Sequence, residues 1–174
     1  FFFKQKTAYE IYQCDWSSDV CSSDLTVRAA RHNDARDAAQ VYLRSRAYAL
    51  PDVPMVHDER EVRRWMSDDV VGRTDMWVAE LDGTVVGLMV LGAGAVGAGG
   101  MRTGWIEQLY LDPAWMGRGL GDRFLEVATS RYPGGVQLWT FVANERARRF
   151  YERHGFVVEE TTDGRDNEER APDH

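Results

Sequence analysis

Lysine is absent from residues 26–174 of this 174-residue chain, which leaves arginine as the only strongly basic side chain there. A nucleoside-triphosphate loop of the G-x-x-x-x-G-K-[ST] type needs a lysine to contact the terminal phosphates. That class of phosphate site is therefore excluded. Cysteine is confined to Cys14 and Cys21, so residues 26–174 have no means of forming a disulfide. Because disulfide-free domains are typical of reducing compartments, we expect a cytoplasmic protein.

The sequence also lacks a convincing membrane span and an excess of positive charge. The uncharged stretch 83–101 approaches the length of a transmembrane helix. Its second half is nearly all glycine and alanine, which give little transfer free energy and poor helix propensity. We interpret the apolar residues 85–91 as part of a strand and 92–100 as a flexible loop. The formal net charge of −7 disfavours a nucleic-acid partner.

Residues 1–25 differ in composition from the rest of the chain. They contain both cysteines and both lysines, no glycine or proline, and a short tandem repeat at 17–20 and 22–25. The segment resembles the translated read-through of a sequencing adapter, and it lacks the apolar run of a signal peptide. We therefore expect residues 1–25 to be a non-native leader, disordered or undocked, followed by one domain at 26–174.

The hydrophobic pattern of residues 26–174 predicts strands and helices in mixed order. Apolar β-branched runs favour strands, and apolar residues at helical spacing favour helices. Asp82-Gly83 is typical of a two-residue hairpin turn. We expect strands at 26–29, 75–81, 84–91, 105–111, 136–142 and 156–161, and helices at 33–49, 58–70, 119–131 and 144–154. This order indicates a mixed α/β fold (α+β) with an antiparallel start and one parallel step.

Residues 116–121, Met-Gly-Arg-Gly-Leu-Gly, lie between a predicted strand and a predicted helix. Unpaired backbone N–H groups and the helix dipole at such a place bind phosphate or diphosphate. The dinucleotide-binding pattern G-x-G-x-x-G does not fit, because Asp122 or Phe124 takes the place of the third glycine. The turn therefore predicts an anion site of another kind.

That turn fits the pattern Q/R-x-x-G-x-G/A, with Gly119 and Gly121 in the glycine places and Met116 in the first. Together with Asn144 and the later Tyr-x3-Gly-Phe segment, it resembles the GNAT superfamily of acetyl-CoA-dependent N-acetyltransferases. The resemblance covers nearly all of 26–174 and implies a single GNAT-like domain, with a mixed, mostly antiparallel sheet flanked by helices. Members usually have one further strand, so we also expect the last strand to be missing and 156–161 to have an unpaired edge.

The resemblance implies acetyl-CoA as co-substrate. Backbone groups of one strand would hold the pantetheine arm and the acyl oxygen, and the turn would hold the diphosphate. Asn144 is either an N-cap alone or a cofactor contact as well, and Arg118 is either a phosphate contact or a solvated charge. The expected cofactor-binding residues are Leu109, Tyr110, Leu111, Met116, Gly117, Arg118, Gly119, Leu120, Gly121 and Asn144.

Acetyl transfer to an amine needs a base for the ammonium and an acid for the leaving thiolate. Strand alternation predicts that Glu107 shares a face with Leu109 and Leu111, and we expect it to act as the base through a water molecule. The alternative is a solvent-facing charge. The resemblance places Tyr151 near the thioester sulfur as the acid, whereas its helical apolar stripe would also suit a core aromatic residue.

The leading hypothesis is direct transfer of acetyl to a primary amine, on a small molecule or a peptide N-terminus, in a ternary complex. The alternative is a non-catalytic acyl-CoA-binding or interaction module. Scattered histidines predict no metal site, Arg123 is expected in solvent, and His154 is expected to cap a helix C-terminus as a cation. The sequence is also compatible with a homodimer. A cationic acceptor would be attracted by acidic residues near its expected entrance, at Asp52, Asp58, Glu59, Asp68 and Asp69.

Overall fold

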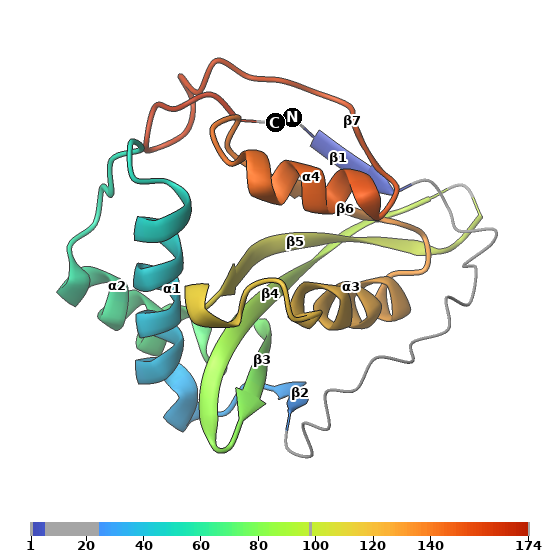
Figure 1. The fold of residues 1–174 in the computed structure, drawn as a ribbon. Coiled ribbons are helices and arrows are strands. Elements are labelled where there is room, and N and C mark those ends of the chain that lie inside the picture. The colour runs from blue at the N-terminus through green and yellow to red at the C-terminus, as the bar shows by residue number, and fades with distance from the viewer. Residues whose placement is uncertain (1, 6–24, 98, 174) are drawn as a thin grey trace.

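The computed structural model describes residues 2–5, 25–97 and 99–173 (Figure 1). One sheet and four α-helices form its frame. In chain order the elements are β1 (Phe2–Gln5), β2 (Thr26–Ala29), η1 (His32–Asp34), α1 (Ala35–Ala49), α2 (Glu59–Trp65), η2 (Met66–Val70), β3 (Asp75–Leu81), β4 (Thr84–Val96), β5 (Arg102–Leu111), η3 (Pro113–Trp115), α3 (Leu120–Arg131), β6 (Val136–Trp139), α4 (Glu145–Arg153) and β7 (Phe156–Val158).

Seven strands pair in the order β2-β3-β4-β5-β6-β1-β7. Strands β5 and β6 run parallel, and the other neighbouring pairs are antiparallel. The turn between β3 and β4 has positive φ at Asp82 and Gly83, 48° and 75°, as a two-residue hairpin requires. The predicted mixed, mostly antiparallel sheet flanked by helices is therefore confirmed.

Helices cover both faces of this sheet, and each face has its own apolar core (Figure 1). Helices α1 and α2 pack on what we call the α1 face, where Leu88 and Val90 of β4 point. Helices α3 and α4 pack on the opposite α3 face, which receives Met89 and Leu91 of the same strand. Burying side chains of this size stabilises the fold by about 1.5–3 kcal/mol each. From Leu88 to Leu91, successive residues of β4 thus contribute to the two faces in alternation.

The predicted flexible loop at 92–100 is wrong in its first half, because β4 continues to Val96. Ala93 pairs with Gly104 and Val96 pairs with Arg102 of β5. At Gly94 a Cβ would collide with the Thr103 side chain, so the close approach of the two strands needs a glycine. Backbone pairing with a neighbour, which local composition does not encode, turns this glycine-rich stretch into a strand.

The expectation of an undocked leader is wrong for residues 2–5, which form β1 between β6 and β7. Strand β1 pairs with the edge of β7 that faces the sheet, and β7 stands last in the described strand order, so its other edge is unpaired as expected. An unpaired strand edge is a strong site for backbone hydrogen bonding, which gives a physical reason for this docking. Residues 6–24 lie outside the described part of the chain, and the non-native origin of 1–25 stays a prediction.

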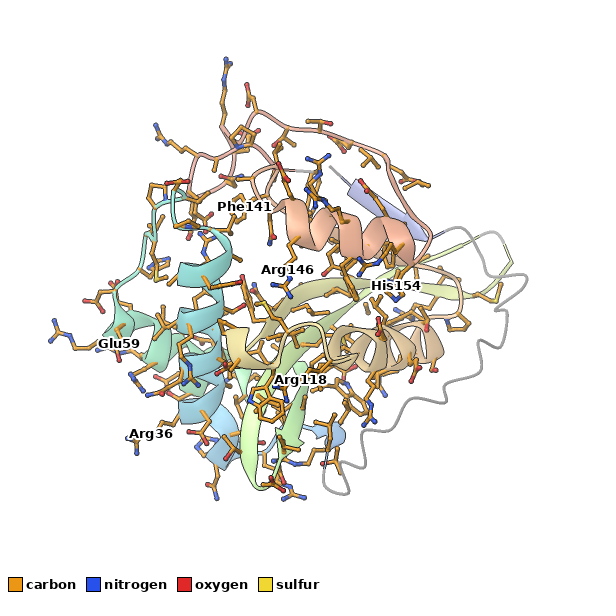
Figure 2. The ribbon with its side chains drawn as sticks, viewed as in Figure 1. Arg36, Glu59, Arg118, Phe141, Arg146 and His154 are labelled. Carbon is orange, nitrogen blue, oxygen red and sulfur yellow. The ribbon has the colours of Figure 1, made fainter. Side chains whose placement is uncertain are left out.

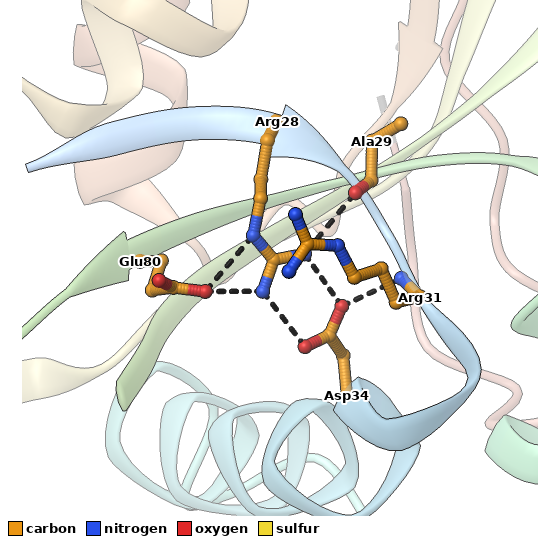
Figure 3. A network of polar contacts seen from close by, with 5 residues as sticks. All are labelled: Arg28, Ala29, Arg31, Asp34 and Glu80. Carbon is orange, nitrogen blue, oxygen red and sulfur yellow. Dashed lines mark hydrogen bonds and ion pairs between the residues drawn. The ribbon is translucent and has the colours of Figure 1, made fainter. Parts of the chain in front are cut away.

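The start of α1 is fixed to the sheet by a polar network around Arg28 of β2 (Figure 3). Its guanidinium donates two hydrogen bonds to Asp34, at 2.7 and 2.9 Å, and also binds Glu80 of β3. The backbone N–H of Arg31 donates to Asp34 at 2.6 Å. The hydrogen bonds from Arg28 lower the pKa of Asp34, and those to Asp34 raise the pKa of Arg28. Asp34 immediately precedes α1, and its side chain binds Arg28 and not the N–H groups of that helix.

Candidate active site

The predicted anion-binding turn at 116–121 follows a short segment that Asp112 holds in place. Asp112 follows β5, and its Oδ1 accepts from the N–H of Ala114 at 3.0 Å while Oδ2 pairs with Arg44 of α1 at 2.9 Å. The chain then bends at Gly117 and Gly119, which have φ of 78° and 77°. Glycine adopts this left-handed conformation without steric cost. Gly119 is the N-cap residue of α3, so the free N–H groups of the first helical turn point out of the bend.

The third glycine of the turn serves packing. A Cβ on Gly121 would lie 2.7 Å from Cζ of Phe150 in α4. The absence of a side chain lets α4 approach the first turn of α3. The turn glycines therefore have two different roles, because Gly117 and Gly119 shape the bend and Gly121 admits the neighbouring helix.

Strands β5 and β6 pair over only three residues and then separate. The register joins Gly104 to Val136 and Ile106 to Leu138, and it stops there. Beyond Ile106, β5 keeps β4 as its partner along one edge. The N–H of Asp112 donates to Val86 of β4 at 2.9 Å, so strict alternation directs the N–H and C=O groups of Leu111 and Leu109 to the other, open edge. This edge leads directly to the turn at 116–121.

A β-bulge lies in β5 at Glu107 and changes the predicted orientation of that residue. Gln108 pairs with Val90, and Ile106 pairs with Leu91, which leaves Glu107 as the extra residue. Leu109 and Leu111 pack on the α3 face, whereas a Cβ on Gly92, which points to the α1 face, would collide with the Glu107 carboxylate. The predicted common face of Glu107 with Leu109 and Leu111 is therefore wrong. Glu107 is exposed on the α1 face.

The two predicted residues of α4 take different positions. Asn144 accepts a hydrogen bond at Oδ1 from the N–H of Ala147 at 3.1 Å, so its N-cap role is confirmed. Tyr151 is 5% exposed and packs between Phe150 and Phe156, with ring centroids 5.2 and 5.3 Å away. Burial raises the pKa of the Tyr151 phenol. The core role of Tyr151 is therefore present in the structure whether or not its hydroxyl also acts in catalysis.

Basic side chains lie around the turn, and one of them was not predicted. Nη2 of Arg146 lies 3.8 Å from the Cβ position of Gly117, and Figure 2 shows its side chain on the side of α4 that faces the start of α3. Arg118 lies over the Trp115 ring at 4.4 Å from its centroid. Arg123 points away and donates to the Leu25 carbonyl at 3.1 Å. Only the tertiary approach of α4 to the turn identifies Arg146, since nothing in its local sequence sets it apart.

His154 caps the end of α4, as predicted, and also links it to α3. Its Nδ1 lies 2.8 Å from the Phe150 carbonyl oxygen, and its Nε2 lies 2.8 Å from Oδ1 of Asp122. Asp122 is in the first turn of α3. The contact therefore helps to hold α4 beside the turn.

Most of the acidic residues expected near the acceptor entrance form contacts with residues close to them in the sequence. Asp58 caps α2 by accepting from Arg60 and Glu61, Glu59 pairs with Arg63, and Asp69 lies 3.6 Å from Arg73. Within residues 2–5, 25–97 and 99–173, no group of three or more His, Cys, Asp or Glu side chains is arranged to hold a metal ion. No described helix is both long and apolar enough to cross a membrane.

A pocket of about 490 Å³ opens between the end of α1 and the start of α4. Its walls include Tyr48 and Ala49 on one side and Ala143 to Arg146 on the other. Arg146 therefore borders this pocket as well as the turn. A smaller hollow of about 290 Å³ lies at the opposite end of α3, beside Trp77 and Arg131. The first pocket is the one that adjoins the predicted site.

Known proteins are similar to this chain in sequence and in fold. A model of the acetyltransferase (GNAT) domain matches residues 72–158. An uncharacterized N-acetyltransferase of Archaeoglobus fulgidus is 30% identical over 135 residues, covering 73% of this chain and 89% of the relative. One of Methanocaldococcus jannaschii is 27% identical over 171 residues, covering 94% of this chain and 71% of that protein.

The fold comparison agrees. The crystal structure of a PaiA N-acetyltransferase of Thermoplasma acidophilum, in complex with coenzyme A, superposes with a TM-score of 0.64. The alignment covers 80% of this chain and 93% of that one at 20% identity. With half of its length matched by the domain model and a relative at 30% identity, this chain belongs to the GNAT acetyltransferase family.

Proposed function

We propose that the protein transfers an acetyl group from acetyl-CoA to a primary amine, by direct attack in a ternary complex. One observation carries this proposal. The open edge of β5 beyond Ile106 runs into a turn whose two glycines have positive φ and whose helix start presents free N–H groups. A strand edge suits the amides of a pantetheine arm, and a helix N-terminus suits a diphosphate.

The local space fits such a ligand. A Cβ at Gly119 would have only Asp122 Oδ2 at 3.6 Å, and one at Gly117 only Arg146 Nη2 at 3.8 Å, so the bend is open on its outer side. Arg146 adds a positive charge there, and Arg118 adds a second on the exposed side of the turn. The related PaiA enzyme of known structure was crystallised with coenzyme A, which further supports the proposal.

Acetyl-CoA would supply a thioester, and the chain would supply positioning and proton transfer. The N–H groups at the open edge near Leu109 and Leu111 would hold the arm and stabilise negative charge on the acyl oxygen. Glu107, exposed on the α1 face, would accept the ammonium proton through a water molecule. The freed amine then forms the new C–N bond as the C–S bond breaks.

Tyr151 would complete the reaction at the sulfur. Because burial raises the pKa of its phenol above the ordinary value of about 10, the hydroxyl stays protonated throughout the physiological range. A raised pKa also makes full proton transfer to a thiolate less favourable. We therefore propose that Tyr151 stabilises the leaving thiolate chiefly as a hydrogen-bond donor, and that solvent finally supplies the proton.

Two measurements test this function. Calorimetry with coenzyme A measures binding to the full chain, and thiol release from acetyl-CoA across a panel of primary amines measures turnover. We expect micromolar to millimolar binding, and amine-dependent release. Binding without release for any amine would favour the non-catalytic acyl-CoA-binding module, and absence of binding to correctly folded protein would refute both functions.

A further inference from the structure

Arg46, in the last turn of α1, is a charged side chain that is only 3% exposed. Its Nη2 donates to Oε1 of Glu169 at 2.8 Å, and its guanidinium lies 4.8 Å from the centre of the Phe141 ring. Its Nε and Nη1 are buried without a hydrogen-bond partner. A buried donor that makes no hydrogen bond costs free energy, so each unsatisfied donor in a native fold needs an explanation.

The surroundings place Arg46 on the acceptor side of the proposed site. The ring of Tyr42 in α1 lies 4.7 Å from that of Tyr110 in β5, centroid to centroid. Arg46 follows Tyr42 by four residues in α1, so the two side chains lie on the same face of the helix. Burial raises the pKa of both phenols, and the positive charge of Arg46 opposes the rise in each. Tyr110 stands between Leu109 and Leu111, and it points to the α1 face. Glu107 is exposed on that same face.

Glu169 comes from the segment after β7, which crosses above the end of α1 (Figure 1). The preceding residue makes a second contact with the helical side of the molecule. Oε2 of Glu168 lies 3.0 Å from Nε2 of His57, and His57 belongs to the connection between α1 and α2. The segment thus brings one carboxylate to Arg46 while two guanidinium nitrogens stay unused. Phe141, on which the guanidinium stacks, lies between the end of α1 and the start of α4 (Figure 2), near the pocket of about 490 Å³.

We propose that Arg46 binds the carboxylate of the acetyl acceptor, so that the acceptor is a small molecule carrying both a primary amine and a carboxylate, such as an amino acid. The proposal rests on the proposed function, whose acceptor it specifies. Glu169 occupies the guanidinium in the absence of the acceptor, and the incoming carboxylate replaces it. A planar guanidinium in a dry site suits carboxylates, and the enclosure of Arg46 favours a small acceptor over a polypeptide.

The test compares an acid with its ester. The coenzyme A complex of the full chain is titrated calorimetrically with each of the twenty common amino acids, and those that bind are compared with their methyl esters. Thiol release is measured with the same pairs. An ester has more of its amine unprotonated and is the better nucleophile, so a preference for the acid reports recognition of the carboxylate. We expect roughly 10- to 100-fold tighter binding and higher kcat/KM for the acid.

Two variants separate recognition from a structural tie. Arg46→Gln should bring the acid-to-ester ratio close to one, mainly through KM, while coenzyme A binding stays unchanged. Glu169→Gln, at a more exposed position, should lower KM for the acid because the competing carboxylate is gone. If the ion pair of Arg46 with Glu169 only holds α1 to the segment after β7, the opposite is expected. Glu169→Gln should then weaken the turnover of acid and ester equally.

The failures of the two proposals are distinguishable. Turnover of amines with no preference for the acid would overturn the role of Arg46 and leave the acetyltransferase function intact. Acid-selective binding without turnover would retain the role of Arg46 and refute the transfer reaction. If Arg46→Gln does not fold, the comparison of acid with ester in the wild type and in Glu169→Gln still decides the matter.

Discussion

Two glycines of this chain share one backbone conformation but differ in place, and alanine at each tests the phosphate turn. Gly119 has φ of 77° and starts α3, whereas Gly155 has φ of 78° and follows α4. A Cβ at Gly155 meets nothing within 4 Å, and one at Gly119 meets only Asp122 Oδ2 at 3.6 Å. Gly119→Ala and Gly155→Ala therefore introduce the same strain without a steric clash.

The cost in stability should be equal for the two variants. The left-handed conformation costs an L-residue roughly 1–2 kcal/mol. For a chain of this size we expect a fall in Tm of roughly 2–8 °C in each variant, measured by thermal denaturation without ligand. The cost in coenzyme A affinity should differ. A methyl group at Gly119 lies where the diphosphate approaches the helix start, and loss of a hydrogen bond to a charged group weakens binding roughly 10- to 100-fold.

Calorimetric titration with coenzyme A makes the comparison at a temperature well below both transitions. We expect Gly155→Ala to keep the wild-type Kd and Gly119→Ala to lose affinity. Equal Kd values in the three proteins would refute the phosphate turn. An equal loss of affinity in the two variants would show that strain, and not the position of the methyl group, weakens binding.

Three further predictions concern single carboxylates and the buried phenols. Glu107→Gln should lower kcat by roughly 10²- to 10⁴-fold with unchanged coenzyme A affinity, and a normal kcat would exclude Glu107 as the base. Because burial raises the pKa of Tyr151 and Tyr110, the free energy of unfolding should fall as the pH rises above about 10, where phenols ionise in the unfolded chain. Urea denaturation across that pH range should show that the free energy of unfolding falls less steeply with pH in Tyr151→Phe than in the wild type. Equal slopes in the two proteins would contradict this prediction. Asp34→Asn should destabilise the fold by about 1.5–3 kcal/mol at pH 7. Since Arg28 lowers the pKa of Asp34, the wild-type advantage should be complete above pH about 4 and vanish as the pH falls further, and urea denaturation that shows a constant difference would argue against the pair.

Local signals in the sequence were sufficient for much of the fold. The bounds of β2 and β3, the hairpin turn at Asp82-Gly83 and the start of α3 follow the prediction. Asn144 caps α4 as expected. Each of these features depends on residues within a few positions of one another, such as a turn dipeptide, an N-cap or the spacing of apolar side chains. The predicted strands 136–142 and 156–161 are shorter in the structure, since pairing with a neighbour decides where a strand ends.

By itself, therefore, the sequence determined the glycine turn, the helix that follows it and the mixed sheet that carries both. Only the tertiary structure decided the face of Glu107, because a bulge arises from the register between two strands and breaks the alternation read along one of them. Only the tertiary structure, likewise, brought Arg146 to the turn and enclosed Arg46 beneath Glu169, 123 residues further along the chain. Contacts between segments so distant in sequence depend on packing and backbone pairing, which no local pattern of residues encodes.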